Sequence, residues 1–455
     1  MLTILYLPLD DRPCNLFFPV YLANIAGIKL RIPPVTIWKD PEKLVSWFSN
    51  HSLNKDTIAI ISLDQYFYGG LVNSRFPYTT IDDLQRLHLK LLPGLLSFKR
   101  SYLFSILPRT QNHIITSSLQ EKFIEELKLY WQKGKSSPIF RRYRKEYFSL
   151  RYRNLTLIKE TANLIKSYKG VLYVVGLDDL FPWGPQEEEI GSLSLLEKPP
   201  FILPGADELG MLLLARGVVE ETNYFPGFFC LFSNPSTVFS HTCYENISID
   251  NILKLQLNLV KCKEVKEPTE AQVIVFVNTP YYKQGEANLP FTYKKALLPK
   301  KILFPFLRQI LNFRNKLIGL ADLSLANGGD IRIANFLINN NLLPYLTSLA
   351  GWNTSANTLG TVIANLAISA IAQRGLRSQF SYRLQRRFLY QRILDDFYYQ
   401  TLWRRKLKKI ELNLAKKYLI EKAQAILNEI GDGPNIHSVS FPWDRVFEIN
   451  FYLDR

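Results

Sequence analysis

The chain has 455 residues, enough for a large buried core, and one or two domains are expected. Hydrophobic residues make up 47% of the sequence, which excludes a disordered chain. The formal net charge of +16 favours polyanions or anionic surfaces as partners, unless the charges lie on solvated helix faces.

Much of the positive charge lies in two stretches. The first contains Arg141, Arg142, Arg144, Lys145, Arg151 and Arg153. The second contains Arg374, Arg377, Arg383, Arg386, Arg387, Arg392, Arg404, Arg405, Lys406, Lys408 and Lys409. Neither stretch is accompanied by a nucleic-acid-binding signature. We therefore interpret both as exposed helix faces and expect no nucleic acid partner.

Three further features of the sequence bear on where in the cell the protein is expected. The first predicted strand begins within three residues of Met1, which leaves no room for a signal peptide. No apolar run reaches the roughly 18 residues that a membrane span needs. The four cysteines show neither CxxC nor zinc spacing, as expected for buried thiols in a reducing compartment. We expect a cytoplasmic protein without a membrane span.

In chain order, residues 1–80 alternate between predicted strands and helices, and the first and third strands end in carboxylates. The strand over residues 4–9 is followed by Asp10, Asp11 and Arg12. The strand over residues 58–63 is followed by Asp64, Tyr68, Gly69, Gly70 and Arg75. The glycine pair permits close backbone approach, and the arginine offers a forked donor for a carboxylate or phosphate.

A fourth strand over residues 101–107 is followed by Arg109, and then by a helical excursion over about 117–168. Next comes an apolar, β-branched run over residues 171–177, which stops at Asp178 and Asp179. Such a run is typical of a parallel strand buried on both faces. The stiff loop after it contains Trp183, and a short strand further on precedes Glu208.

The second half repeats the pattern of apolar strands with polar ends. The residues that follow its strands are Asn278, Asp322, Asn327, Asp330, Trp352, Asn353 and Asn357. Residues 361–455 are mostly helical, basic and aromatic. We predict an α/β core over residues 1–360 and a basic helical region over 361–455 that packs on it.

Parallel strands with flanking helices fit two folds. We favour a (β/α)8-like barrel over an open doubly wound sheet. No GxGxxG motif follows the first strand, which counts against the nucleotide-binding versions of the open sheet. In both folds ligands bind at the carboxyl ends of the strands. We predict that the strands ending at Leu9, Leu63, Leu177 and Ala321 are neighbours in one sheet or barrel, so that their carboxylates form one site.

Several short motifs, taken together, resemble the bacterial domain of unknown function 4127 family over roughly residues 1–450. They are residues 7–13 (LPLDDRP), 62–64 (SLD), 68–71 (YGGL), 74–75 (SR), 176–179 (GLDD), 205–208 (GADE), 277–280 (VNTP), Asp322, 326–330 (ANGGD), 351–354 (GWNT) and 357–360 (NTLG). The resemblance implies a single full-length family domain and no particular activity.

The first hypothesis is a hydrolase acting on a carbohydrate or glycoside. Such enzymes need one protonated and one ionised carboxyl group. The candidate catalytic residues are Asp10, Asp64, Asp178, Asp179 and Asp322. The candidate substrate-binding residues are Asp11, Arg12, Tyr68, Gly69, Arg75, Arg109, Trp183, Glu208, Asn278, Asn327, Asp330, Trp352, Asn353 and Asn357. The expected partner is a saccharide or another small molecule.

Two alternatives remain open. The same aspartates could hold Mg²⁺ in a hydrolase or phosphoryl-transfer enzyme, since this ion prefers oxygen ligands. Only five histidines occur and none lies in a motif, which argues against zinc or iron. No cofactor is firmly implied. The last alternative is a non-enzymatic ligand-binding protein.

Overall fold

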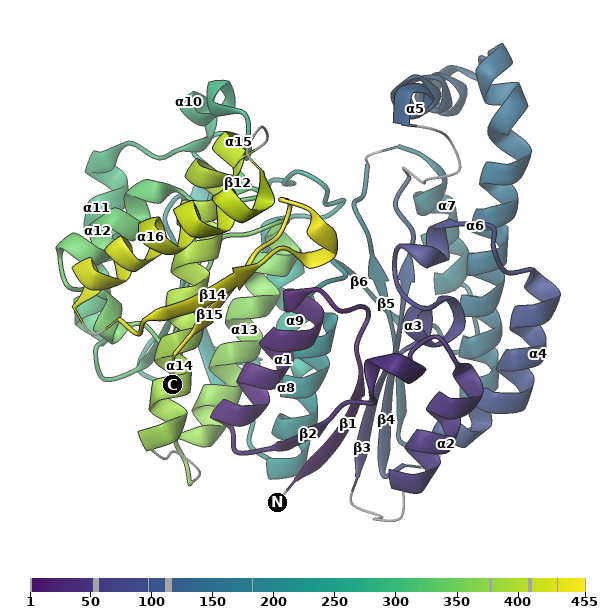
Figure 1. The fold of residues 1–455 in the computed structure, drawn as a ribbon, viewed down its shortest axis with the longest axis horizontal. Coiled ribbons are helices and arrows are strands. Elements are labelled where there is room, and N and C mark those ends of the chain that lie inside the picture. The colour runs from purple at the N-terminus through teal and green to yellow at the C-terminus, as the bar shows by residue number, and fades with distance from the viewer. Residues whose placement is uncertain are drawn as a thin grey trace. The chain divides into compact units, whose positions relative to one another are not determined.

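The computed structural model describes residues 2–51, 57–96, 98–110, 117–181, 183–375, 379–407, 411–431 and 433–454 (Figure 1). The chain divides into two compact units. Unit 1 comprises residues up to Asp10 together with Lys29–Gly210, and unit 2 comprises Asp11–Ile28 and Met211–Arg455.

Unit 1 is built on a parallel sheet with the strand order β2-β1-β3-β4-β5-β6. The strands are β1 (Thr3–Leu7), β2 (Lys29–Arg31), β3 (Ile58–Ser62), β4 (Arg100–Leu107), β5 (Val171–Leu177) and β6 (Phe201–Pro204). β3 is buried along its whole length, as its unbroken apolar sequence predicts. The strand order reverses between β1 and β3, and ligand crevices of open sheets form at such reversals.

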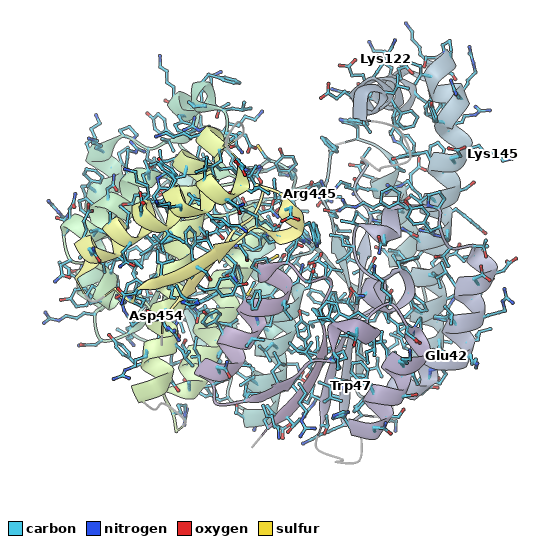
Figure 2. The ribbon with its side chains drawn as sticks, viewed as in Figure 1. Glu42, Trp47, Lys122, Lys145, Arg445 and Asp454 are labelled. Carbon is cyan, nitrogen blue, oxygen red and sulfur yellow. The ribbon has the colours of Figure 1, made fainter. Side chains whose placement is uncertain are left out.

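The helices of unit 1 are α2 (Pro41–His51), α3 (Leu63–Tyr68), α4 (Ile81–Leu91), α5 (Ser117–Lys133), α6 (Pro138–Ile165) and α7 (Pro185–Ser194). Short 3-10 turns occur at Val35–Ile37, Asn73–Arg75 and Leu92–Leu96. The predicted excursion corresponds to α5 and α6, which share a core of Phe123, Leu127, Phe140 and Tyr147. Lys122 and Lys145 are exposed on these two helices (Figure 2).

Unit 2 has a second parallel sheet, with the order β13-β11-β9-β7-β8. Its strands are β7 (Gly227–Phe232), β8 (Lys263–Glu264), β9 (Val273–Asn278), β11 (Leu317–Asp322) and β13 (Ser348–Ala350). Two small pairs complete the unit, β10 (Gly285–Glu286) with β12 (Leu325–Ala326), and β14 (Ile436–Ser440) with β15 (Asn450–Leu453). Counted along the chain within each unit, both sheets contain the order 2-1-3-4-5 of one common class of doubly wound sheet.

The helices of unit 2 are α1 (Pro13–Ile25), most of α8 (Leu209–Thr222), α9 (Ile249–Val260), α10 (Tyr293–Ala296), α11 (Lys300–Arg308), α12 (Ile331–Asn339), α13 (Ser355–Ala372), α14 (Gln379–Arg392), α15 (Arg404–Leu407) and α16 (Leu412–Ile430). Further 3-10 turns lie at Pro235–Thr237, Pro290–Thr292, Gln309–Phe313, Leu343–Tyr345 and Pro442–Asp444. Between α14 and α15 the chain forms a π-helix, Ile393–Trp403. The predicted helical character of the C-terminal region is confirmed.

One prediction about the strands needs correction. The strands before Asp10, Asp64 and Asp178 do lie parallel in one sheet, but the strand before Asp322 belongs to the other sheet. The larger sheets of the described residues are two separate parallel sheets, and no closed barrel is detected among them. Apolar strand runs look alike wherever they pair, so their sequence does not tell which sheet each one joins. The predicted domain boundary at residue 360 stays a prediction.

The predicted exposure of the basic stretches is confirmed only in part. Arg141, Arg142, Arg144, Lys145, Arg374, Arg383 and Lys406 are exposed, and Arg386, Arg387, Arg404 and Arg405 are half-buried. The prediction is wrong for Arg151, Arg153 and Arg392, which are buried. Arg377, Lys408 and Lys409 lie outside the described residues.

One helix departs from the prediction that no apolar segment is long enough for a membrane span. In the described part of the chain α13 alone meets that criterion, by length and composition, with 18 residues and a mean hydropathy of 1.3. All of this segment is buried inside the structure. It packs on β11 and β13 of its own sheet, as the central helix of a folded core does.

Gly176 in β5 provides a test of the unit 1 sheet. A Cβ added there would lie 2.4 Å from the backbone oxygen of Gly205, so Gly176→Ala requires a backbone shift. We expect a loss of about 1–3 kcal/mol in the free energy of unfolding, measured by denaturant titration. Gly191→Ala is the matched control, because Gly191 lies in α7 with nothing within 4 Å of the added Cβ. The control should gain roughly 0.5–1 kcal/mol from helix propensity. A Gly176→Ala protein as stable as the native one would contradict the packing described.

Candidate functional site

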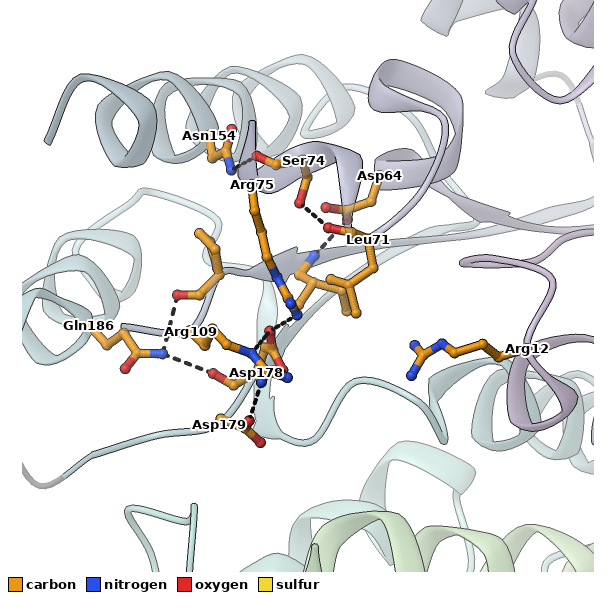
Figure 3. A network of polar contacts seen from close by, with 12 residues as sticks. Arg12, Asp64, Leu71, Ser74, Arg75, Arg109, Asn154, Asp178, Asp179 and Gln186 are labelled. Atoms are coloured by element: carbon orange, nitrogen blue, oxygen red, sulfur yellow. Dashed lines mark hydrogen bonds and ion pairs between the residues drawn. The ribbon is translucent and has the colours of Figure 1, made fainter. Parts of the chain in front are cut away.

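The carboxyl end of β5 carries a buried carboxylate held by two arginines (Figure 3). The side chain of Asp178 is 6% exposed. Arg109, after β4, donates from Nη2 to Oδ1 at 2.8 Å and from Nε to Oδ2 at 3.0 Å. Arg75, in the loop after β3, also donates to Oδ2. Paired, charge-assisted hydrogen bonds of this kind are strong and directional, so this carboxylate links three loops.

Asp179 shares the same arginine but is more accessible. Its φ angle is +34°, so the chain leaves the strand direction directly after Asp178. The turn lets both neighbouring carboxylates reach Arg109, whose Nη1 lies 2.7 Å from Oδ2 of Asp179. Burial, supported by the charge of Asp178 and opposed by Arg109, raises the pKa of Asp179 from 3.8 to about 6. Burial is therefore a larger cause of the raised pKa than repulsion between the two adjacent carboxylates.

A second layer of side chains fixes the loops that carry these residues. The buried guanidinium of Arg151 on α6 forms an ion pair with Glu189 on α7, with Nη2 2.6 Å from Oε2. The same guanidinium donates to the backbone oxygens of Pro108 at 3.0 Å and Arg109 at 2.9 Å. Gln186 donates to the backbone oxygen of Asp178 at 3.1 Å. The helical excursion therefore has a structural role at the sheet edge.

The loop that carries Arg75 is held from the same helix. Arg153 Nη2 and Asn154 Nδ2 donate to the backbone oxygen of Ser74 at 2.7 and 3.0 Å. The guanidinium carbon of Arg153 lies 4.9 Å from the ring centroid of Tyr68, a cation–π contact. The position of Arg75 is therefore fixed through the backbone of Ser74, the residue before it, and not by a strand.

Asp64 and the glycine pair lie at the reversal of the strand order. The Asp64 side chain accepts a hydrogen bond from the backbone N–H of Ile106 at 2.8 Å, and burial raises its pKa from 3.8 to about 7. Gly69 ends α3 with φ +75°, and Gly70 follows with φ +121°. A Cβ on Gly70 would lie 3.8 Å from the Cβ of Asp10, so the loops after β1 and β3 adjoin.

Further carboxylates lie at the end of β6. Glu208 is fully buried, and a Cβ on Gly205 would lie 1.8 Å from its Oε1, so the glycine makes room for it. Asp207 is buried and close enough to raise the pKa of Asp179 through like-charge repulsion. The sequence analysis named Glu208 as a candidate site residue but not Asp207. The feature of the sequence that could have identified Asp207 is its position after a predicted strand.

Unit 2 has its own network of polar side chains at the sheet edge. Oδ1 of the fully buried Asp322 accepts from Asn278 Nδ2 at 2.8 Å and from Ser324 Oγ at 2.7 Å, and Oδ2 accepts from the Asp330 backbone N–H at 2.5 Å. Burial and the charge of Asp330 raise the pKa of Asp322 to about 6. With both oxygens engaged, Asp322 fixes the loop after β11.

The π-helix supplies residues that the sequence analysis missed. Arg392 donates to Asp396 at 2.7 Å and to Asp395 at 3.0 Å, and Asp396 accepts from the Gly351 backbone N–H at 2.9 Å. Burial raises the pKa of Asp396 to about 7. π-helical segments are rare and often occur at functional sites. The available signal was an adjacent pair of aspartates in an otherwise aromatic and apolar stretch.

A small cavity of about 20 Å³ lies beside this network within unit 2, with room for one or two waters. Its polar lining comprises Asn327, Asn353, Asp395, Gln400 and Glu448, and its apolar lining includes Cys14, Phe18 and Trp352. Asn327 and Asn353 have φ angles of +58° and +51°, which asparagine tolerates better than most residues. Cys14 is one of the four cysteines, all of which are free thiols.

The structure divides the predicted site residues into two groups. Unit 1 holds Asp10, Asp64, Tyr68, Gly69, Arg75, Arg109, Asp178, Asp179, Trp183 and Glu208. Unit 2 holds Asp11, Arg12, Asn278, Asp322, Asn327, Asp330, Trp352, Asn353 and Asn357.

Several members of the unit 2 group have structural partners. Asp11 accepts from Trp443 Nε1 at 2.7 Å, and Arg12 pairs with Glu448 at 3.1 Å. Asp330 caps α12, and Asn357 completes the capping box of α13 with Thr354.

The magnesium alternative finds no prepared ligand set. Within the described ranges no group of three or more His, Cys, Asp or Glu side chains is arranged to hold a metal ion. Both oxygens of Asp178 already accept hydrogen bonds from arginine. A metal at this carboxylate would have to displace a charged guanidinium.

The chain belongs to the family described as protein of unknown function (DUF4127), which residues 4–452 match. The match covers nearly the whole chain, in agreement with the motifs seen in the sequence. Comparison with curated proteins and with solved structures gives no match.

The ion pair of Arg151 with Glu189 can be tested by paired substitution. Glu189→Gln leaves a buried guanidinium without its anion, and we expect a loss of about 3–5 kcal/mol in the free energy of unfolding. Arg151→Met should cost a similar amount, while Arg151→Met/Glu189→Met should cost clearly less than the sum of the two. Denaturant titration measures the free energy of unfolding of the native chain and of the three variants.

Glu197→Gln is the control for this cycle. It removes the exposed pair with Lys166, so its effect should stay within about 1 kcal/mol. Additive losses in the double variant would contradict the direct pairing of Arg151 and Glu189.

Proposed function

We propose that this family member is a hydrolase that cleaves a glycosidic bond, with Asp179 as the proton donor. The observation that carries the proposal is the contrast between two adjacent carboxyl groups that share Arg109. Asp178 is 6% exposed and bound by two arginines, whereas Asp179 is 20% exposed and has its pKa raised to about 6. A carboxyl group with this pKa can hold a proton near neutral pH and release it in the reaction.

Further residues of the same unit support this proposal. Asp207, in the loop after β6, is the second carboxylate, and it acts on water or on the sugar carbon. The neighbouring strands β5 and β6 deliver the two carboxylates to one edge. Phe181 and Trp183 follow Asp179 in the same loop with ring centroids 5.4 Å apart, and such faces stack on sugar rings.

In the proposed mechanism Asp179 donates its proton to the leaving oxygen while the bond to the sugar carbon breaks. Arg109 then stabilises the carboxylate that forms, since its Nη1 already contacts Asp179. Asp178 stays ionised and keeps Arg109 in place through its two hydrogen bonds. Arg109 is thus already in position to stabilise the negative charge that forms on Asp179.

Asp179→Asn tests the proton donor. Asparagine keeps the size, tolerates the positive φ and cannot donate the proton, so turnover should fall about 10²-fold or more. The measurement uses a panel of aryl glycosides that differ in the acidity of the leaving phenol. The loss should nearly vanish for the most acidic phenol, because that leaving group needs no proton. Asp82→Asn is the control, since Asp82 is exposed in the first turn of α4.

The outcomes of this experiment separate the alternatives. An equal loss for all leaving groups would show that Asp179 only positions other groups. Activity that a chelator abolishes and Mg²⁺ restores would favour the metal alternative. If no glycoside in a broad panel is cleaved by the native chain, the proposal is overturned.

The raised pKa also predicts a pH dependence of stability. Between about pH 4 and 6 the folded chain keeps a proton on Asp179 that the unfolded chain has released, so the free energy of unfolding falls as the pH rises. In Asp179→Asn this fall should be smaller. Asp64, Asp322 and Asp396 contribute similar slopes to both proteins, so the difference between the two curves isolates Asp179. Denaturant titrations from pH 4 to 8 measure it, and parallel curves would contradict the raised pKa.

A further inference from the structure

A second pocket, remote in the sequence from the carboxylates of unit 1, lies within unit 2 and has a volume of about 380 Å³. Pockets for small ligands usually begin at about 300 Å³, so the space suits one small molecule. Its lining consists of Pro344, Tyr382, Arg383, Arg386, Arg387, Tyr390, Pro434 and Asp454. Asp454 follows β15, close to the end of the chain (Figure 2).

The helix α14 supplies the charge of this arginine pocket. Arg383, Arg386 and Arg387 are spaced three and four residues apart, so they emerge on one face of the helix. No carboxylate of the described residues forms an ion pair with any of the three. Arg392 on the same helix, in contrast, is paired with two aspartates. Three cations and the single carboxylate of Asp454 leave the pocket with a net positive charge.

Two of the arginines are held in place without being neutralised. Arg386 donates to the backbone oxygen of Leu343 at 2.7 Å and to the hydroxyl of Tyr390 at 3.2 Å. Arg387 donates from Nη2 to the backbone oxygens of Leu453 and Asp454. Its Nε atom is buried and has no hydrogen-bond partner among the residues that the structure describes. These guanidinium groups are fixed yet retain donors and full charge.

We propose that the arginine pocket binds the phosphate group of a small phosphorylated molecule. A doubly charged phosphate with three oxygens matches several forked guanidinium donors, and arginine is the preferred residue for such recognition. The phosphate accepts from Arg383, which is exposed at the pocket, and from the free donors of Arg386 and Arg387. Tyr382 lies beside them and contacts the organic part of the ester.

The test is binding of inorganic phosphate and glycerol 3-phosphate by the full chain, measured by titration calorimetry at constant ionic strength set with sodium chloride. We expect saturable binding of both probes in the millimolar range or tighter. Arg383→Gln should weaken binding about 10-fold or more. Arg314→Gln is the matched control, because Arg314 is an exposed arginine of unit 2 outside the pocket, and it should change affinity less than about twofold.

Two more variants test the geometry and the sign of the charge effect. Arg387→Lys keeps the charge but loses the forked donor, so it should weaken phosphate binding while the melting temperature confirms that the chain folds. Asp454→Asn removes the one carboxylate of the lining and should tighten binding. Gain from one variant and loss from another cannot both arise from unfolding.

Three results would overturn the assignment. One is the absence of saturation up to about 10 mM of either probe. Another is equal weakening by Arg383→Gln and Arg314→Gln, which would indicate a general effect of net charge. The third is binding to phosphatidic acid vesicles without binding to either soluble probe, which would assign the pocket to a membrane lipid. None of these results bears on Asp179 or on glycoside cleavage.

Discussion

The edge of unit 1 depends on one buried contact, the carboxylate of Asp178 between Arg75 and Arg109. Taking these charges out of water costs free energy that a hydrophobic cluster would not cost. The contact joins the loops after β3, β4 and β5 through side chains, in addition to the backbone hydrogen bond from the Asp178 N–H to Leu107 at the end of β4. Arg151 and Arg153 on α6 then fix the same loops from behind through backbone oxygens. An arrangement of this cost and rigidity is expected at a site where charges must keep their positions during a reaction.

The sequence predicted the parts of this edge that depend on local patterns. Apolar runs that stop at Asp10, Asp64 and Asp178 gave the strands and the direction of the sheet, because a parallel strand buried on both faces leaves a recognisable sequence. The family followed from the motifs at these strand ends. Which strands share a sheet did not follow, since pairing over long sequence distances leaves no mark in a single strand.

The residues that the sequence analysis misjudged depend on contacts between distant segments. Arg151 and Arg153 are in a basic stretch whose other members are exposed, and only the packing of α6 on the sheet buries them. Asp395 and Asp396 became visible as site candidates only because the π-helix brings them to Gly351 and Arg392. Charge runs in a sequence give the composition of a helix, whereas burial of single members depends on its orientation.

The two units share a strand order but differ in how their edge carboxylates are bound. In unit 2, Asp322 is fully buried and its oxygens accept hydrogen bonds from Asn278, Ser324 and Asp330, so its carboxylate does not reach the solvent. In unit 1, Asp179 is partly exposed, and its contact with Arg109 opposes the rise in pKa that burial causes.

The backbone supports the same distinction. A φ of +34° at an aspartate is uncommon, and such strain persists where the surroundings determine the conformation. Here it turns Asp179 out of the strand and toward the arginine that its neighbour holds, while an extended backbone would have sent the two side chains to opposite faces. The strained turn is therefore what lets two adjacent aspartates contact the same arginine, one buried and one partly exposed.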